Sequence, residues 1–262
     1  MKIFMDVGGN EGQTLKEVSK EKYSFDKIFC FEPSIVFYET LKEFSKKDNR
    51  IHICNFGLGD KNSKKRLYAS GTLRGSIYKQ NSEDDKINSE IIEIVNTSEW
   101  YSNNINKDDL VFIKLNCEGS EIDILNNLID SGLFIDIYNI LITFDIREFK
   151  EYQDEEIKLR KRLKANNLIN FCFADNVMIG NTHEKRIENW LKIFGADKIN
   201  ESKENLKRIH KAQFLNYSKK RGLFNIYEVR LKRLIGYESY PRTLKSFFKF
   251  IKNSLGLTRE KK

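Results

Sequence analysis

The first third of the chain alternates short apolar runs with amphipathic stretches. The apolar runs cover residues 2–7, 27–32 and 51–55, and the stretches between them, 13–22 and 35–46, carry apolar residues at helical spacing. Strands that alternate with helices in this way form βαβ units and a mainly parallel sheet. The pattern therefore predicts an α/β domain of Rossmann-like architecture, with helices that flank the sheet.

The same alternation continues to about residue 173. Further strands are predicted at 110–115, 138–144 and 168–173, with helices at 120–131 and 155–165. The run at 110–115 is apolar throughout, which is typical of a central strand covered on both faces. We expect this strand to lie near the middle of the sheet.

Between residues 56 and 101 the pattern is less regular. Residues 65–69 are predicted to return as a hairpin beside the third strand, and 91–95 to form a short edge strand. Ser98 is expected to be the N-cap of a brief helix through Trp100. The polar stretch 70–88 contains Gly71 and Gly75 and is predicted to be a loop over the site.

The pattern changes after residue 180. The chain becomes lysine-rich and helical, and a docking stripe is predicted from Trp190, Leu191, Ile193 and Phe194. The sequence thus predicts two parts, a ligand-binding α/β domain over residues 1–180 and a basic helical segment over 181–262.

A glycine-containing loop, residues 6–12 (DVGGNEG), joins the first strand to the first helix. This position in a Rossmann-like sheet leaves backbone N–H groups free to receive a ligand. Gly8 permits the tight turn, and Gly12 lets the helix begin close to the sheet. Similar loops also occur as plain structural turns, so the loop alone does not identify a ligand.

Glu32 ends the second strand about twenty residues after Gly12, where a carboxylate accepts hydrogen bonds from both hydroxyls of an adenosine ribose. NAD and S-adenosylmethionine share that requirement. A loop for NAD commonly reads G-x-G-x-x-G, whereas here Asp6 precedes the turn and Asn10 occupies its middle. A carboxylate repels a pyrophosphate but suits a sulfonium and an ammonium group. The loop favours S-adenosylmethionine, with an NAD-dependent sugar oxidoreductase or epimerase as the alternative.

Four motifs in this order resemble those of the FkbM family of methyltransferases. They are the loop at 6–12, the Phe31-Glu32-Pro33 corner, residues 57–60 (GLGD) and residues 113–121 (IKLNCEGSE). The resemblance spans residues 1–149. It implies a class I methyltransferase fold, S-adenosylmethionine as cofactor, and methylation of a hydroxyl, less commonly an amine, on a surface glycan or another glycan-modification component.

The resemblance also implies roles for individual residues. The methionine part of the cofactor would contact residues of the loop, the ribose would contact Glu32, and the adenine would lie near the end of the third strand. The loop residues are Asp6, Gly8, Gly9, Asn10 and Gly12, and those of the third strand's end are Asn55, Phe56 and Gly57.

On the acceptor side the resemblance places Lys114, Asn116, Glu118 and Glu121. The family usually has an aspartate where this chain has Asn116 and a valine-like residue where it has Cys117. If that aspartate acts as a base or metal ligand in the family, the role of general base in this chain falls to Glu118 or, second, to Asp145 after the fifth strand. Because Asn116 replaces the expected acid, a cofactor-binding module without catalysis is an alternative hypothesis.

Three of these residues also have structural interpretations. Glu121 opens a helix, where an acid is favoured by the helix dipole or pairs with Lys114. Lys114 stands in an apolar strand, so a buried ion pair is expected whatever its function. Cys117 is expected to pack. Outside the motifs, an acceptor could contact Thr72, Arg74 or Ser76 of the loop, or stack on Trp100 or Tyr101.

Composition narrows the class of protein. No run approaches the roughly 18 apolar residues of a membrane-spanning helix, and the glycine loop follows Met1 too closely for a signal peptide. We therefore expect a cytoplasmic protein. The cysteines and histidines show no metal-ligand or triad spacing, and the cysteines are expected to be reduced and mostly buried; these residues are Cys30, Cys54, Cys117 and Cys172, and His52, His183 and His210.

The net charge of +8 is concentrated at the C-terminal end. Residues 203–262 carry 17 basic and 4 acidic side chains, about +13, which leaves about −5 for the rest. Residues 241–262 have the pattern of a basic amphipathic helix. Docking on its own domain or on a second subunit is expected first, and peripheral contact with an anionic membrane second. Nucleic acid is not an expected partner, because the tail lacks an RNA-binding motif.

Overall fold

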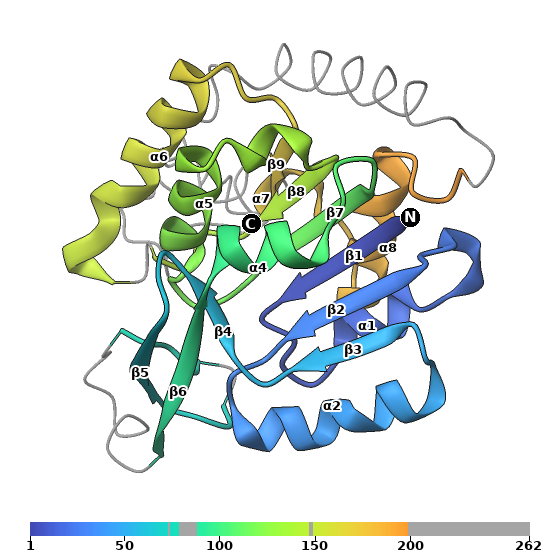
Figure 1. Ribbon diagram of the computed structural model, residues 1–262, viewed down its shortest axis with the longest axis horizontal. Coiled ribbons are helices and arrows are strands. Elements are labelled where there is room, and N and C mark those ends of the chain that lie inside the picture. The colour runs from blue at the N-terminus through green and yellow to red at the C-terminus, as the bar shows by residue number, and fades with distance from the viewer. Residues whose placement is uncertain (73, 79–87, 147–148, 199–262) are drawn as a thin grey trace, which may run out of the picture. The chain divides into compact units, whose positions relative to one another are not determined.

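Six parallel strands form the main sheet of the computed structural model, which describes residues 1–72, 74–78, 88–146 and 149–198 (Figure 1). Their order is β3-β2-β1-β7-β8-β9, and every neighbouring pair runs parallel. The bounds are β1 Lys2–Val7, β2 Lys27–Phe31, β3 Ile51–Cys54, β7 Leu110–Leu115, β8 Asn139–Ile142 and β9 Phe171–Phe173. The predicted α/β fold with a mainly parallel sheet is confirmed.

Helices cover the sheet on both faces. They are α1 Gln13–Val18, α2 Ile35–Lys47, α4 Thr97–Asn104, α5 Glu121–Asp130, α6 Gln153–Ala165, α7 Ala174–Val177 and α8 His183–Ile193, with short 3₁₀ turns at η1 Glu21–Tyr23, η2 Leu133–Asp136 and η4 Lys150–Tyr152. Alternate residues of a strand face opposite sides. Ile3 and Met5 of β1 therefore join the core under α4, α5 and α6, while Phe4 packs against Phe25 and Trp190.

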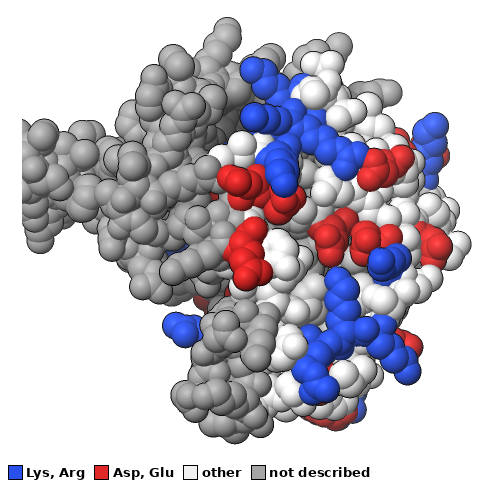
Figure 2. All heavy atoms as spheres, turned by 90° about the vertical axis from the view of Figure 1, so that its left-hand side faces the viewer, with Lys and Arg blue, Asp and Glu red and all other residues white. Residues whose placement is uncertain are grey.

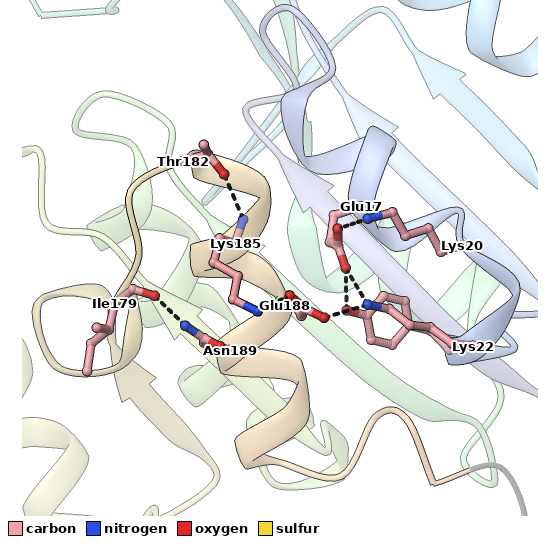
Figure 3. Close-up of polar contacts among 9 residues, drawn as sticks. Glu17, Lys20, Lys22, Ile179, Thr182, Lys185, Glu188 and Asn189 are labelled. Carbon is pink, nitrogen blue, oxygen red and sulfur yellow. Dashed lines mark hydrogen bonds and ion pairs between the residues drawn. The ribbon is translucent and has the colours of Figure 1, made fainter.

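The helix α8 lies against α1 and the sheet (Figure 3). Trp190 and Leu191 are fully buried, and the Trp190 indole N–H donates to Asn139 Oδ1 at 2.7 Å. At the seam, Lys22 pairs with Glu188 at 2.8 Å and with Glu17 at 3.0 Å. The predicted docking stripe thus packs on the α/β unit. The boundary near residue 180 stays a prediction.

A second, three-stranded sheet has the order β4-β6-β5, with β4 Gly57–Gly59, β5 Ser63–Tyr68 and β6 Ser89–Asn96. The predicted hairpin of 65–69 with the third strand is wrong, because β5 pairs antiparallel with β6. The predicted edge strand at 91–95 is the middle strand. It pairs parallel with β4 on one side and antiparallel with β5 on the other, and its alternate residues Ile92 and Ile94 are buried with Leu67.

Two predicted helix ends also differ. The N-cap of α4 is Asn96, whose Oδ1 accepts from the Glu99 N–H at 3.0 Å, and Ser98 lies inside the helix. The first helix ends at Val18, earlier than predicted. The Glu17 carboxylate accepts the Tyr23 hydroxyl at 2.6 Å and pairs with Lys22, so the chain turns back along α1 as η1.

Charges of both signs are interspersed on the face shown in Figure 2, where a band of acidic side chains separates two groups of basic ones. Lys65 of β5 and Asp123 of α5 lie 3.5 Å apart, and Arg162 of α6 pairs with Asp130 of α5. These pairs join the second sheet and α6 to the same helix. Within the described ranges no helix is long and apolar enough to cross a bilayer.

The chain divides into two units, Met1–Phe214 and Leu215–Lys262. All the described residues belong to the first. The basic amphipathic helix predicted at 241–262 lies outside the described residues.

Candidate functional site

A cleft of about 720 Å³, part of it open to solvent, lies at the carboxyl edge of the main sheet. Figure 1 shows the arrowheads of β1, β2 and β3 directed toward the second sheet, and the cleft is formed between the two. It is lined by Val7, Gly8, Asn10, Phe31, Glu32, Pro33, Ser34, Phe37, Gly57, Leu58, Leu67, Gly71, Thr72, Gly75, Ile77, Ile92, Ile94, Asn116, Cys117, Glu118 and Ser120.

The cleft stands where the strand order reverses. β1 has β2 on one side and β7 on the other: the chain proceeds outward from β1 to β2 and β3 in one direction, and from β7 to β8 and β9 in the opposite direction. Ligands of open α/β sheets bind at the carboxyl ends of the strands at such a point. Gly8, Glu32 and Asn116, one from the end of each strand, all line the cleft.

The glycine loop depends on its glycines for two different reasons. Gly8 has φ +88°, and a Cβ there would lie 1.9 Å from the Asn116 carbonyl oxygen. Gly9 has no such torsion, but its Cβ would lie 2.3 Å from Cys30 Sγ. The chain therefore passes so close to β7 and β2 that neither position accepts a side chain without movement.

The loop uses its own backbone donors. Each of the five N–H groups from residue 8 to residue 12 donates to an acceptor in the protein: Gly8 and Gly9 to the Phe31 carbonyl (3.0 and 3.1 Å), Asn10 to Glu32 Oε2 (2.8 Å), Glu11 to Asn10 Oδ1 (2.7 Å) and Gly12 to the Gly9 carbonyl (2.9 Å). The expectation that the loop leaves N–H groups free for a ligand is wrong. The loop is a rigid wall rather than an anion cradle.

Glu32 is 6% exposed and lines the cleft. Its Oε1 accepts from the Ser34 N–H at 2.9 Å and its Oε2 from the Asn10 N–H at 2.8 Å. Burial raises the pKa of this carboxyl, and the two backbone N–H groups oppose the shift. Each carboxylate oxygen accepts more than one hydrogen bond, so Glu32 retains acceptor capacity toward ligand hydroxyls.

Asp6 and Lys114 form a buried ion pair beneath the loop and do not line the cleft. The Lys114 ammonium lies 2.9 Å from Asp6 Oδ1, without the angles of a hydrogen bond, and donates to the Gly8 carbonyl at 2.8 Å. Burial raises the pKa of Asp6, and the Lys114 charge opposes the shift. The pair predicted for Lys114 is present, and it fixes the loop from below.

His183, the first residue of α8, completes this buried group. Its Nε2 lies 2.9 Å from Thr14 Oγ1 of α1. Burial lowers the pKa of His183 to about 4, and the nearby Lys114 charge lowers it as well. The imidazole is therefore neutral at physiological pH. Sequence spacing had no signal for this contact, since 169 positions separate the two residues.

Of the three residues expected near an adenine, only Gly57 lines the cleft. The Asn55 amide donates to the carbonyls of Glu32 and Pro33, both at 3.1 Å. The Phe56 ring packs 5.8 Å from Phe31. Asn55 and Phe56 thus hold the corner after β2 in position rather than facing the cleft.

The other end of the cleft is the turn after β7. Its residues Asn116, Cys117, Glu118 and Ser120 line the cleft, and Glu118 and Gly119 have φ of +51° and +111°. Asp145 lies behind the turn, where its Oδ2 accepts from the Glu118 N–H at 3.3 Å. The Asp145 carboxylate thus contacts the backbone of Glu118, and of the two predicted bases Glu118 is the one that lines the cleft.

Glu121 clamps this turn to the segment after β8. It is fully buried, and its two oxygens accept from the N–H groups of Gly119 and Ile146, each at 2.8 Å. Burial, and then the charge of Asp145, raise the pKa of Glu121 to about 8. The expected partner Lys114 pairs with Asp6 instead.

Of the other residues expected to contact an acceptor, some lie in the core and some line the cleft. Trp100 packs edge-on against Phe29 and Phe31 at 4.9 and 4.8 Å, and Tyr101 is buried, so both belong to the core. Thr72 lines the cleft, whereas Ser76 donates to the Glu118 carbonyl at 2.5 Å. Cys117 also lines the cleft, and burial raises the pKa of its thiol.

The sequence pattern did not predict the apolar wall that the second sheet contributes. Leu58, Leu67, Ile92 and Ile94 line the cleft opposite the glycine loop. This sheet is fastened to the start of α2 by Glu90, which accepts from the Ile35 N–H at 3.3 Å and from the Ser70 hydroxyl. The alternation of Ile92 and Ile94 with polar residues indicates a strand with one buried face, but it does not show that this strand lies in the middle of a sheet.

Two of the described residues that line the cleft, Glu32 and Glu118, carry a carboxylate, and none of them carries a cationic side chain. Nor do the described parts of the chain hold a group of three or more His, Cys, Asp or Glu side chains placed to bind a metal ion. The cleft is therefore suited to a neutral or cationic ligand with hydroxyl groups.

Comparison with known proteins identifies no family for this chain. No protein-family model matches the chain, and no curated protein matches it. Among solved structures, the methyltransferase FkbM from Methylobacillus flagellatus KT shares 19% identity over 49% of this chain, with a TM-score of 0.32. The match spans 30% of that chain's length. At this TM-score it supports no conclusion about activity, and the fold assignment stands on the strand order.

Proposed function

We propose that the chain is an S-adenosylmethionine-dependent methyltransferase that acts on a hydroxyl, less commonly an amine, of a glycan component. One observation carries the proposal: among its described residues the cleft is lined by carboxylates and by no cation, beside a loop whose N–H groups are all used. A pyrophosphate needs N–H donors or cations. An adenosyl sulfonium is itself cationic and needs neither.

The residues present fit such a cofactor. Glu32 would accept the ribose hydroxyls, and the apolar wall of Leu58, Ile92 and Ile94 would cover the adenine. Gly8 and Asn10 of the loop line the cleft, and the methionine part would lie against them. When bound, the cofactor supplies an electrophilic methyl group.

The chain's own contribution to the reaction is placement and proton removal. A hydroxyl held in line with the methyl group needs a base within hydrogen-bond reach. Glu118 lines the cleft at the end where an acceptor would enter, and it takes the hydroxyl proton. Asp145 is a positioning residue, because it accepts from the Glu118 N–H and so holds the turn.

The alternative that retains support is an NAD-dependent sugar oxidoreductase or epimerase, since dinucleotide-binding sheets share this parallel strand order. Calorimetric titration with S-adenosylhomocysteine and with NAD separates the two. We expect binding of the first only, weakened about 10- to 100-fold in Glu32→Gln by the loss of charge-assisted bonds. Glu39→Gln, at an exposed position of α2, is the matched control. Binding of NAD alone would refute the proposal.

Catalysis is tested separately from binding. In an assay of methyl incorporation into surface-glycan intermediates, Glu118→Gln should lower turnover about 10²- to 10⁴-fold, as expected for loss of a general base. Its affinity for S-adenosylhomocysteine should not change. Turnover that survives in both Glu118→Gln and Asp145→Asn would contradict the base assignment. Tight cofactor binding with no turnover in the wild type would identify a non-catalytic module.

A further inference from the structure

Three aromatic rings gather beside the acceptor end of the cleft. Tyr78 lies 5.2 Å from Phe149 and 4.7 Å from Tyr152 between ring centroids, with interplanar angles of 47° and 58°. Phe149 is buried and joins the main core, whereas Tyr152 is 37% exposed. Among the exposed large hydrophobic side chains of the described residues, Tyr152 is the aromatic one. The cluster therefore passes from the core to a ring that faces solvent.

The cluster is fastened to the turn that holds Glu118. The Tyr78 ring lies directly over Gly119, where a Cβ would come within 2.7 Å of Tyr78 Cδ2. The Ser76 hydroxyl donates to the Glu118 carbonyl at 2.5 Å and accepts from the Tyr78 N–H at 3.1 Å. The rings and the Glu118 turn thus have a fixed relation, as a binding platform beside a base requires.

We propose that Tyr152 and Tyr78 form the platform on which the acceptor's sugar ring rests, an inference that depends on the proposed function. A sugar has an apolar C–H face and a rim of hydroxyls. The tyrosine rings offer an aromatic surface for the face, and Glu118, whose turn is packed under Tyr78, accepts from the hydroxyls. The acceptor class is a neutral pyranoside ring.

Position also separates this platform from a purely structural aromatic cluster. Trp100, the ring first expected to stack on a sugar, is held edge-on by two phenylalanines of the core. Tyr152 is the last residue of η4, directly before α6, and it is partly exposed to solvent. Removal of the Tyr152 ring should therefore change the stability of the fold little, but it removes the outer surface of the platform.

Saturation-transfer NMR with a panel of methyl glycosides tests the platform on the full chain saturated with S-adenosylhomocysteine. At least one glycoside should receive saturation on the C–H protons of one ring face. The signal should fall at least fivefold in Tyr152→Ala and persist in Tyr152→Phe. Ile135→Ala is the matched control, because Ile135 is 71% exposed on η2, at the amino end of β8.

Each outcome has one meaning. Two outcomes would overturn the platform. One is an equal glycoside signal in Tyr152→Ala and in the wild type. The other is no glycoside signal from the wild type while phenol, added as a planar probe, does receive saturation. Thermal unfolding of each variant checks that it is folded. Titration of the same samples with S-adenosylhomocysteine keeps the two proposals apart, since absence of cofactor binding refutes the proposed function, whereas cofactor binding without a Tyr152 effect refutes the platform alone.

Discussion

The two ends of the cleft are built on different principles. At the glycine loop, the N–H groups of residues 8–12 are all bonded within the protein and a buried ion pair supports the loop from below. At the turn after β7, two consecutive residues have positive φ, and side chains from three other segments hold them there. Strained backbone concentrates at functional sites. The loop is thus held by hydrogen bonds of its own backbone, whereas the turn is held by side chains of other residues.

The largest effect should come from closing the glycine-loop end. Gly8→Ala places a Cβ 1.9 Å from a backbone oxygen at a φ that L-residues rarely adopt. We expect the free energy of unfolding to fall by about 5 kcal/mol. Binding of S-adenosylhomocysteine should no longer be detectable. Chemical denaturation and calorimetry measure the two. The control Gly132→Ala has a similar φ, +76°, but no atom within 4 Å, so a loss as large as at Gly8 would contradict the steric argument.

Removal of the support beneath the loop should have the next largest effect. Lys114→Met leaves the fully buried Asp6 without its cation, which should cost about 3–4 kcal/mol in urea denaturation. Adding Asp6→Asn to this variant should restore much of the stability. Lys158→Met, which removes an ion pair at a 69% exposed side chain, should stay within about 0.5 kcal/mol. If the double variant were no more stable than Lys114→Met, the loop would not depend on the pair.

The smallest effect concerns the clamp at the turn end. The pKa of Glu121 is about 8 in the folded protein and near 4.5 when unfolded. Between those values the folded state binds a proton that the unfolded state lacks, so stability falls as pH rises from 5 to 8. We expect the wild type to lose stability over this pH range, and Glu121→Gln to lose less. If the stability of the wild type and that of Glu121→Gln changed in parallel with pH in denaturation experiments, the Glu121 carboxyl would not titrate between pH 5 and 8.

The sequence predicted the main sheet well because its strands lie between helices and carry local signals. Continuous apolar runs in β1, β2 and β7 and the turn residues after them suffice to order a parallel sheet. The second sheet was predicted poorly. Its strand β6 is half polar, and its place between β4 and β5 depends on pairings with residues about 30 positions away.

The candidate site follows the same division. Glu32, Glu118 and the glycine loop could be predicted because they follow strands at the carboxyl edge of the sheet. The partner of Asp6, the contact of His183 with Thr14 and the ring of Tyr152 over Tyr78 could not, since each joins segments far apart in the chain. Their distances depend on how helices and turns pack, which local patterns do not encode.

The docking of α8 has a consequence for how the protein is made. Phe4 precedes Trp190 by 186 positions along the chain, yet its ring is covered by that indole. Synthesis at some 5–20 residues per second leaves that underside of β1 without its lid for about ten seconds or more. A nascent chain that stops before α8 presents an open apolar surface, and is therefore a natural client for chaperones.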